Sequence, residues 1–225
     1  MVENKKITPT QPSPIDGEAK KERDFQRKKH TAVFLDRDGT INEEVGYLDS
    51  IDKLKLFANT AEAIKMINKG GMKVVVITNQ SGVARGYFNE ELVRRVHTRI
   101  QKIIKAKGAF IDAFYYCPHH PEGIGTYQQA CACRKPETGL LMMAAQDLDI
   151  DLTRSYVVGD MVKDIQVASK VGAKGLLVKT GYGLNTIRTD LTQGTAETCQ
   201  PCYIAEDILD AVKWIMDDRM ENESP

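Results

Sequence analysis

The sequence predicts an α/β fold in which a parallel sheet is covered by helices on both faces, giving three layers. Short apolar runs alternate along the chain with longer stretches whose apolar residues recur every three or four positions. The runs are typical of buried strands, and the longer stretches are typical of amphipathic helices. Such an alternation favours a parallel sheet. The 225 residues are enough for one domain with a sizeable core.

The elements can be placed in order along the chain. Strands are expected at the apolar runs Ala32–Leu35, Lys73–Thr78, Ala113–Cys117, Tyr156–Asp160 and Gly175–Thr180. Helices are expected at Thr60–Asn68, Glu90–Lys105, Gly139–Leu148, Val162–Lys170 and Glu206–Met216. We expect residues 30–219 to form the domain. A polar leader at 1–29, expected to be disordered, precedes it, and a tail at 220–225 follows it.

Composition and charge exclude several functional classes. Lys plus Arg and Asp plus Glu both number 31, so the formal net charge is zero. A balanced charge gives no overall field that would attract nucleic acid or an anionic membrane. No apolar run approaches the ~20 residues that span a bilayer, and the N-terminal stretch lacks the apolar core of a signal peptide. We therefore expect a cytoplasmic protein without a nucleic-acid or membrane partner.

Three carboxylates come directly after expected strands. Asp36 and Asp38 follow the first apolar run within the segment DRDGTIN, and Asp160 follows the run YVVG. In extended backbone, residues two apart point to the same side, so Asp36 and Asp38 can face one site. Ligands of parallel sheets bind beyond the carboxyl ends of the strands. Because neighbouring carboxylates repel unless a cation compensates, the pattern predicts a Mg²⁺ site.

The segment DRDG alone would also fit an ordinary turn or a calcium-binding loop, because Asp and Gly favour turns. No Glu stands at the twelfth position of such a loop, and an apolar strand precedes the segment. Thr78 at the end of the second expected strand, a later Lys135 and the segment GDMVKD accompany it. Together these features favour a site for phosphoryl transfer.

A second cluster, of cysteine and histidine, lies in the segment CPHHPEGIGTYQQACACRKP. Four of its five Cys and His residues suit a closed tetrahedral Zn²⁺ site, and the alternative is a set of free thiols. The predicted zinc ligands are Cys117, His119, Cys131 and Cys133. His119 is preferred to His120 because its spacing matches that of the later cysteine pair. The metal would order the long loop at 117–133 and direct Arg134 and Lys135 toward the carboxylates.

Cys199 and Cys202 form a separate Cys-x-x-Cys pair near the end of the chain. We interpret them as two ordinary cysteines, because no second pair of ligands remains to complete a metal site. If they were half of a zinc site, they would displace Cys117 and His119.

Four segments resemble, in order, the four motifs of the haloacid dehalogenase superfamily. They are DRDGT at Asp36–Thr40, ITN with Thr78, RKP with Lys135, and GDMVKD with Asp160 and Asp164. The resemblance covers residues 31–183. It implies a three-layer Rossmann-like parallel sheet of the haloacid dehalogenase type, with no large cap domain. It also implies a Mg²⁺-dependent phosphatase that works through an aspartyl-phosphate.

The resemblance assigns a role to each matching residue. Asp36 would be the nucleophile, and Asp38 would protonate the leaving oxygen and then activate water. Thr78 and Lys135 would bind oxygens of the transferring phosphoryl group. Asp164 would either hold Lys135 or join the metal site through a bound water. The implied Mg²⁺ ligands are Asp36, Asp38 through its backbone carbonyl, and Asp160.

Within the superfamily, further segments resemble the D-glycero-D-manno-heptose 1,7-bisphosphate 7-phosphatase family. They are DRDGTIN, Gly46-Tyr47, TNQSGVARG at Thr78–Gly86, CPHHPEG and CACRKP. The resemblance implies hydrolysis of the C7 phosphate to give heptose 1-phosphate, in nucleotide-heptose and lipopolysaccharide core synthesis. Arg134 would recognise the second phosphate, and Arg85 is either an extra cation or a solvated loop residue. The implied sugar contacts are Glu44, Val45, Gly46, Tyr47, Asn79, Gln80 and Ser81.

Alternatives remain open beside this interpretation. Histidinol-phosphate phosphatase, a close relative, shares RKP but typically has a shorter loop and lacks SGVARG. The zero net charge argues against a DNA 3′-phosphatase, and the complete catalytic set argues against a zinc-stabilised binding module without activity. Relatives often carry a basic residue where Met161 stands, so that contact is lost here. We expect a monomer that acts on a small-molecule sugar bisphosphate of either anomer.

Overall fold

The structure, a computed structural model, describes residues 29–191 and 199–223 and has the predicted α/β architecture. The strands are β1 (Ala32–Leu35), β2 (Lys73–Asn79), β3 (Ala113–Cys117), β4 (Tyr156–Gly159), β5 (Lys174–Val178) and β6 (Tyr203–Ala205). All lie parallel in one sheet, in the order β3-β2-β1-β4-β5-β6. The leader predicted at 1–29 falls outside the described residues, apart from Lys29.

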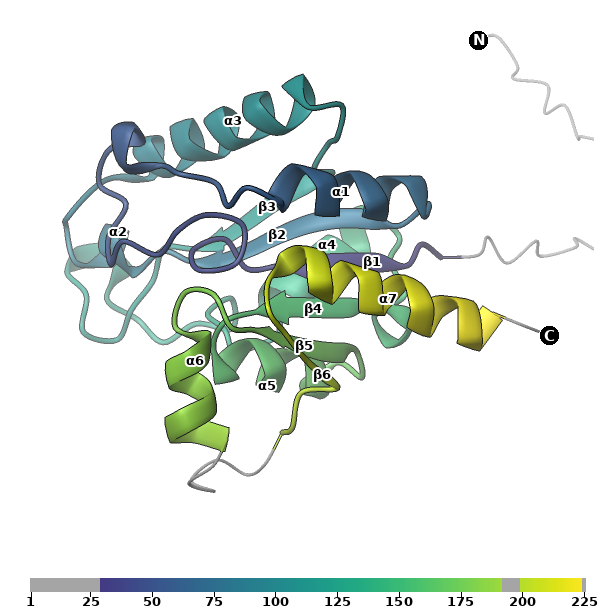
Figure 1. Cartoon of the computed structure of the whole chain (residues 1–225). Coiled ribbons are helices and arrows are strands. Elements are labelled where there is room, and N and C mark those ends of the chain that lie inside the picture. The colour runs from purple at the N-terminus through teal and green to yellow at the C-terminus, as the bar shows by residue number, and fades with distance from the viewer. Residues whose placement is uncertain (1–28, 192–198, 224–225) are drawn as a thin grey trace, which may run out of the picture.

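Helices cover both faces of the sheet, as the strand–helix alternation predicts (Figure 1). They are α1 (Thr60–Lys69), α2 (Ser81–Ala84), α3 (Glu90–Ala106), α4 (Gly139–Asp147), α5 (Val162–Lys170), α6 (Gly183–Thr186) and α7 (Ile208–Glu223). α1, α3 and α7 pack on one face, whereas α4 and α5 pack on the other. Single helical turns lie at Ile51–Lys53, Gly125–Tyr127, Leu152–Arg154 and Ile187–Leu191.

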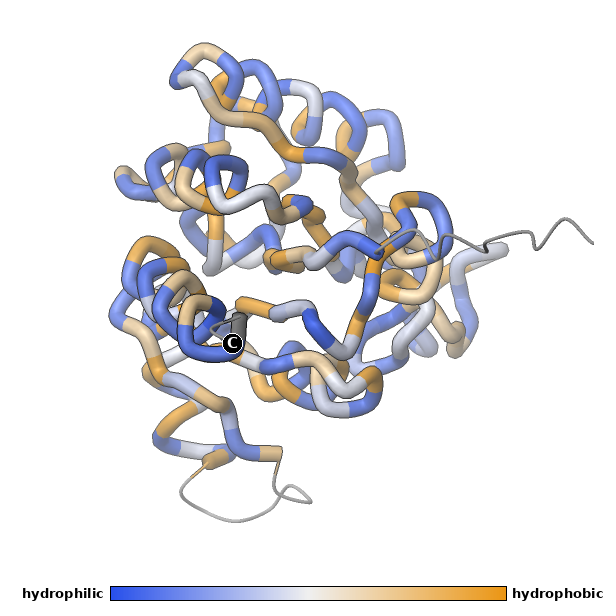
Figure 2. Tube along the Cα trace, turned by 90° about the vertical axis from the view of Figure 1, so that its right-hand side faces the viewer, coloured by the Kyte–Doolittle hydropathy of each residue, from blue (hydrophilic) through white to orange (hydrophobic). Residues whose placement is uncertain are grey.

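The central strand β1 shows how a core forms on both faces of the sheet. Its four side chains are all 0% exposed and point alternately to opposite faces. Val33 and Leu35 join the cluster beneath α1, α3 and α7. Ala32 and Phe34 join the cluster beneath α4 and α5. The helices match this arrangement, with hydrophobic and hydrophilic residues alternating along each coil (Figure 2). Burial on both faces therefore fixes β1, and with it Asp36 at its end.

The carboxyl-terminal part of the chain differs from the prediction. The sequence does not predict β6, because three residues are too few for a periodic pattern and Ile204 is exposed. α7 begins at Ile208 and continues to Glu223, so residues 220–223, which the sequence places in a tail, lie in this helix. The short helices α2 and α6 are also additions to the predicted elements.

The strand order places the carboxyl ends of β1 and β4 side by side at the centre of the sheet. The connections run in opposite directions from this point, and such a switch point is where ligands bind in open α/β sheets. Within the described residues no connection forms a large cap domain over this edge. No helix in the described part of the chain is long and apolar enough to cross a bilayer.

Candidate active site

A pocket of about 160 Å³ opens at the carboxyl edge of the sheet, where β1, β2 and β4 end. Most of the predicted site residues line it. They are Asp36, Asp38, Glu44, Gly46, Tyr47, Thr78, Asn79, Gln80, Ser81, Arg134 and Asp160. The exception among the predicted sugar contacts is Val45, which does not line the pocket and has an exposed side chain. Glu44 and Gly46, on either side of Val45, line the pocket, whereas the side chain of Val45 is exposed to solvent.

Lys135 lies beneath the pocket and is only 2% exposed. Its Nζ is 2.9 Å from Asp36 Oδ1 and 2.6 Å from Asp164 Oδ1. It also donates a hydrogen bond of 3.0 Å to the carbonyl of Ile77. Burial alone would lower the pKa of Lys135, but the carboxylates of Asp164 and Asp36 outweigh it and raise the pKa. Lys135 is therefore a buried cation directly beside the predicted nucleophile.

Asp36, Asp160 and Asp164 form an acidic cluster, in which Asp164 of α5 takes the place of Asp38 in the set Asp36, Asp38 and Asp160 that the strand ends predict. Each offers a carboxylate oxygen within 4.8 Å of the others. Burial raises the pKa of Asp160 to about 8, and the charges of Asp36 and Asp164 add to this. Gly39 leaves room for the cluster, because a Cβ there would lie 2.1 Å from Asp160 Oδ2. Hard oxygen donors whose charges repel one another fit a divalent cation such as Mg²⁺, and they do not suit a soft metal.

The carboxylate of Asp38 faces the same pocket but is held by different partners. Arg37, a buried side chain, donates two bonds of 3.0 and 3.1 Å to Asp38 Oδ1 and one of 2.7 Å to Oδ2. Asn42 and Gln80 each donate a further bond of 2.9 Å. Burial would raise the pKa of Asp38, but Arg37 and the other donors lower it. Asp38 therefore rests as a carboxylate, and it must first take up a proton before it can act as an acid.

The end of β2 supplies the polar groups opposite Asp36. Thr78 is buried, and its Oγ1 accepts a bond of 2.9 Å from Gln80 Nε2. Asn79 uses both ends of its amide on the backbone of Lys135, with two bonds of 3.0 Å. Asn79 thus lines the pocket, as predicted for a sugar contact, but its amide is engaged in positioning Lys135.

The zinc loop brings its four predicted ligands together. Their ligand atoms all lie within 4.8 Å of one another. Cys131 Sγ is 3.3 Å from Cys117 Sγ and 2.8 Å from Cys133 Sγ, and His119 Nδ1 is 3.4 Å from Cys133 Sγ. Three sulfurs and one imidazole nitrogen converging on a point fit Zn²⁺, which accepts these soft and borderline ligands. His120 lies outside this group and near Arg85 instead.

The same loop places two cations at the pocket. Arg134 donates a bond of 3.2 Å to the carbonyl of the zinc-loop residue His119 and lines the pocket, and Lys135 follows it directly. Arg85 has a different place. It forms an ion pair of 3.1 Å with Glu122 and does not line the pocket, so it joins the end of α2 to the zinc loop.

Sequence reasoning did not find several residues of the site, and two of them matter for its chemistry. Lys163, in the first turn of α5, lines the pocket and has no ion-pair partner within the described residues. Its charge reaches Asp36 and Asp160, so a cation is present in the pocket although position 161 carries Met161. Tyr182 lines the pocket from the turn after β5. The rule that sites lie at strand ends would have found Tyr182, whereas no sequence pattern distinguishes Lys163 from a surface lysine.

Comparisons with known proteins support the resemblance that the motifs indicate. Residues 132–211 match a family model described as haloacid dehalogenase hydrolase-like. A D-glycero-D-manno-heptose-1,7-bisphosphate 7-phosphatase of Thermosynechococcus vestitus is 42% identical over 189 residues, which cover 82% of this chain and 94% of that protein. A D-glycero-beta-D-manno-heptose-1,7-bisphosphate 7-phosphatase of Escherichia coli is 43% identical over 157 residues, covering 68% of this chain and 82% of that protein.

A solved structure extends the likeness to the whole sheet. The crystal structure of a D,D-heptose 1,7-bisphosphate phosphatase from B. bronchiseptica, complexed with magnesium and phosphate, aligns with a TM-score of 0.73 and 30% identity. The alignment covers 84% of this chain and 99% of that one. The similarity therefore includes the fold as well as the motifs, over nearly the full length of the relative.

Proposed function

The chain belongs to the D-glycero-D-manno-heptose-1,7-bisphosphate 7-phosphatase family of haloacid dehalogenase-like hydrolases, and from this premise we propose its reaction. It hydrolyses the C7 phosphate of the heptose bisphosphate and leaves heptose 1-phosphate. The observation that carries the proposal is the position of Asp36, whose carboxylate faces the pocket while its Oδ1 contacts buried Lys135 at 2.9 Å.

Asp36 acts as the nucleophile and forms a bond to phosphorus, while protonated Asp38 gives its proton to the ester oxygen that leaves. Lys135 stays protonated, so it holds the attacking carboxylate in place and offsets negative charge as the phosphoryl group approaches. Thr78 donates its hydroxyl hydrogen to an oxygen of that group, since its own oxygen already accepts from Gln80. Asp38 then removes a proton from the water that cleaves the aspartyl-phosphate, a role that suits its lowered pKa.

Mg²⁺ fits the acidic cluster, and Asp36, Asp160 and the backbone carbonyl of Asp38 would hold it. Asp164 serves chiefly as the partner of Lys135, because its Oδ1 lies 2.6 Å from Nζ. When bound, the metal supplies charge neutralisation for the phosphoryl oxygens. The relative from B. bronchiseptica, which carries magnesium and phosphate, supports this assignment.

The second phosphate of the substrate meets the cations of the pocket. Arg134 and Lys163 both line the pocket, and Lys163 has no carboxylate partner among the described residues. Glu44 also lines the pocket, and its negative charge disfavours an anion next to it. A substrate with two phosphates therefore fits the distribution of charge better than histidinol phosphate, whose distal end is cationic.

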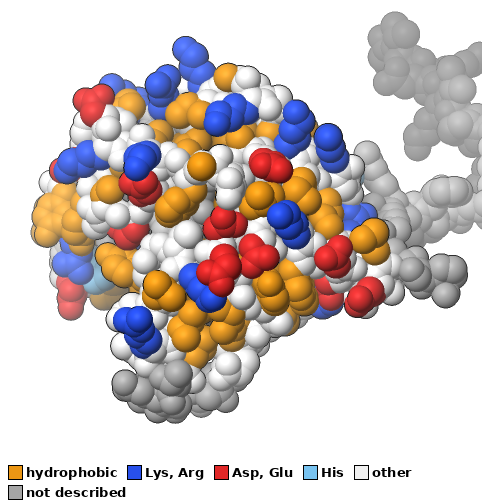
Figure 3. Space-filling model, viewed as in Figure 1, with side chains coloured by type: hydrophobic (Ala, Val, Ile, Leu, Met, Phe, Trp, Pro, Cys, Tyr) orange, Lys and Arg blue, Asp and Glu red, His pale blue; other side chains and the backbone are white. Residues whose placement is uncertain are grey.

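Cys117, His119, Cys131 and Cys133 would hold a structural Zn²⁺ in the loop at 117–133, and such an ion would stabilise the positions of Arg134 and Lys135 at the pocket. The zero net charge and the mixed distribution of Lys, Arg, Asp and Glu over the face in Figure 3 fit a small-molecule substrate rather than a nucleic acid. The product would serve nucleotide-heptose synthesis in the cytoplasm, and the working unit is a monomer.

The test is phosphate release from a panel of esters in the presence of Mg²⁺. The heptose bisphosphate should be turned over with a higher kcat/KM than heptose monophosphates or histidinol phosphate. A preference for histidinol phosphate would replace the proposed substrate, and absence of turnover with every ester would contradict the proposed enzyme class.

A further inference from the structure

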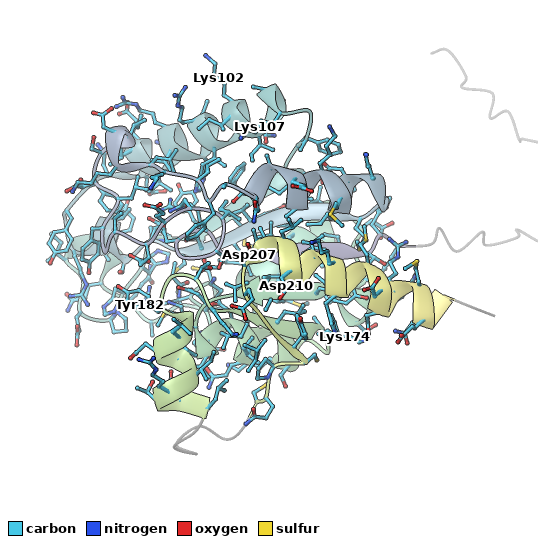
Figure 4. All side chains as sticks on the ribbon, in the orientation of Figure 1. Lys102, Lys107, Lys174, Tyr182, Asp207 and Asp210 are labelled. Atoms are coloured by element: carbon cyan, nitrogen blue, oxygen red, sulfur yellow. The ribbon has the colours of Figure 1, made fainter. Side chains whose placement is uncertain are left out.

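A second cavity, of about 440 Å³, adjoins the active-site pocket. It is lined by Glu43, Glu44, Gly46, Phe57, Gly181 and Tyr182. Three of these residues, Glu44, Gly46 and Tyr182, also line the pocket that contains Asp36, so they form the wall between the two spaces. Figure 4 labels Tyr182 at the end of the molecule where α2 and α6 lie.

The backbone of Tyr182 is held firmly against the acidic cluster. Its N–H donates a bond of 2.8 Å to Asp160 Oδ2, and the nearby Thr180 Oγ1 donates a bond of 2.6 Å to the carbonyl of Gly39. Gly181 has φ +57°, and a Cβ there would lie 2.3 Å from Asp160 Oδ2. Only glycine at position 181 allows the turn to approach Asp160 this closely, and this contact fixes the backbone position of Tyr182.

The side chains on this wall have unused hydrogen-bonding groups. The phenol of Tyr182 has no hydrogen-bond partner among the described residues, and its side chain is partly exposed. Glu44 accepts a bond from the N–H of Gly46 through Oε1, while its Oε2 has no recorded partner in the described part of the chain. The phenol of a tyrosine is protonated at neutral pH and can donate a hydrogen bond. A donor and an acceptor thus face one space.

We propose that Tyr182 joins Glu44, which the family resemblance already implies as a sugar contact, in a subsite for the neutral hydroxyl groups of the substrate, and that Tyr182 determines specificity there. Substrate hydroxyls accept from the phenol and donate to the carboxylate, since a hydroxyl can do both. A phosphate group is disfavoured at this wall, because Glu43 and Glu44 both face the second cavity. The inference deepens the proposed function and rests on it: it divides the site into an anion side at Arg134 and a polyol side at Tyr182.

Binding affinity tests the subsite without depending on turnover. Wild type and Tyr182→Phe are compared in an Asp36→Asn background with Mg²⁺, using calorimetry with mannose 6-phosphate and with inorganic phosphate. Loss of one hydroxyl contact should weaken sugar-phosphate binding by about three- to tenfold. Binding of inorganic phosphate, which carries no sugar hydroxyl, should change by less than about twofold. Tyr203→Phe, a tyrosine on β6 far from the pocket, is the matched control.

Three outcomes separate this inference from the function on which it rests. If Tyr182→Phe and Tyr203→Phe changed the affinity for mannose 6-phosphate by the same factor, the proposed subsite would be wrong. Equal weakening of both ligands, together with a lower melting temperature, would assign Tyr182 a structural role and would also overturn it. Phosphate release is measured separately with the intact Asp36. If sugar-phosphate binding depends on Tyr182 but the wild type releases no phosphate, the proposed function fails while the subsite stands.

Discussion

The floor of the pocket and its outer wall use polar groups in opposite ways. The floor consists of Asp36, Lys135, Asp160 and Asp164, which are all buried, and its lysine contacts two carboxylates. The outer wall is a larger set than the partition between the two cavities: it consists of side chains that are partly or largely exposed to solvent, namely Glu44, Tyr47, Arg134, Lys163 and Tyr182. Lys163 and the phenol of Tyr182 have no side-chain partner within the described residues. The charged groups of the floor therefore bind one another, whereas Lys163 and the Tyr182 phenol in the wall are available to bind a ligand.

This difference predicts which residues of the site tolerate substitution. Removing one member of a buried charge cluster leaves another charge unpaired in a medium that solvates it poorly, so the floor admits little variation. Changing a partly exposed side chain costs little stability, because water replaces the lost contact. We therefore expect mutations in the floor to abolish activity or folding, and mutations in the wall to alter substrate choice.

The largest expected effect is at the nucleophile. Asp36→Asn keeps the shape of the side chain but removes the attacking oxygen, so kcat should fall by about a thousandfold or more. The ion pair between Lys135 and Asp164 remains, and the melting temperature should therefore stay close to that of the wild type. Phosphate release and thermal unfolding measure the two effects. Full turnover by the variant would contradict the assignment of Asp36.

The next effect concerns the zinc loop, which connects floor and wall through Lys135 and Arg134. Cys131→Ser removes one of four converging ligands, so bound zinc should be lost and the free energy of unfolding should fall by about 3 kcal/mol or more. Elemental analysis and chemical denaturation give these quantities. Cys202→Ser, at an exposed cysteine outside the cluster, is the control and should retain both. A wild-type protein without zinc would contradict the metal assignment.

A smaller effect comes from His97, a buried residue of α3. Its ring stacks on Phe114 with centroids 4.7 Å apart, and its Nε2 has no hydrogen-bond partner in the described residues. Burial, and then the charge of Arg37, lower the pKa of His97 to about 3 from 6.5. The folded state thus keeps the ring neutral, while the unfolded state protonates it below pH 6.5.

Stability should therefore be full above about pH 6.5 and fall as the pH drops below that value. This group accounts for about 2 kcal/mol of lost stability between pH 7 and pH 5. His97→Phe should remove that part of the pH dependence in denaturation curves, whereas the exposed His30→Gln should not. A wild-type slope retained in His97→Phe would show that other groups cause it.

The smallest effect is at the cationic side of the wall. Lys163→Met removes a charge without changing side-chain length greatly, so KM for a sugar bisphosphate should rise about tenfold relative to that for a monophosphate. kcat should change much less, because Lys163 forms no hydrogen bond or ion pair with the floor within the described residues. Lys170→Met, at an exposed lysine of the same helix, is the control. If Lys163→Met changed KM equally for the bisphosphate and the monophosphate, Lys163 would not bind the second phosphate.

Sequence alone predicts the floor well and the wall only in part. Asp36 and Asp160 follow strands that are buried on both faces, so their positions follow from the pattern of apolar runs. The zinc ligands are also predictable, because their chemistry is carried by residue type and spacing. Arg37, whose guanidinium holds Asp38, is hidden between the two aspartates, and no pattern indicates that it is buried.

The wall depends on how loops from distant parts of the chain meet. Tyr182 and Glu44 are far apart in the sequence and become neighbours only because the turn after β5 packs against the segment after β1. Val45 shows the converse: it belongs to a matching segment, but its side chain is exposed and does not line the pocket. Side-chain direction in irregular segments is set by tertiary contacts, which a single sequence does not reveal.

The central claim is that floor and wall together remove one particular phosphate from a bisphosphate. The most direct measurement is ³¹P NMR of the wild-type protein with Mg²⁺ and D-glycero-D-manno-heptose 1,7-bisphosphate. The predicted result is loss of the C7 phosphate signal, appearance of inorganic phosphate and retention of the C1 phosphate signal. Loss of the C1 signal, or equal loss of both, would contradict the account.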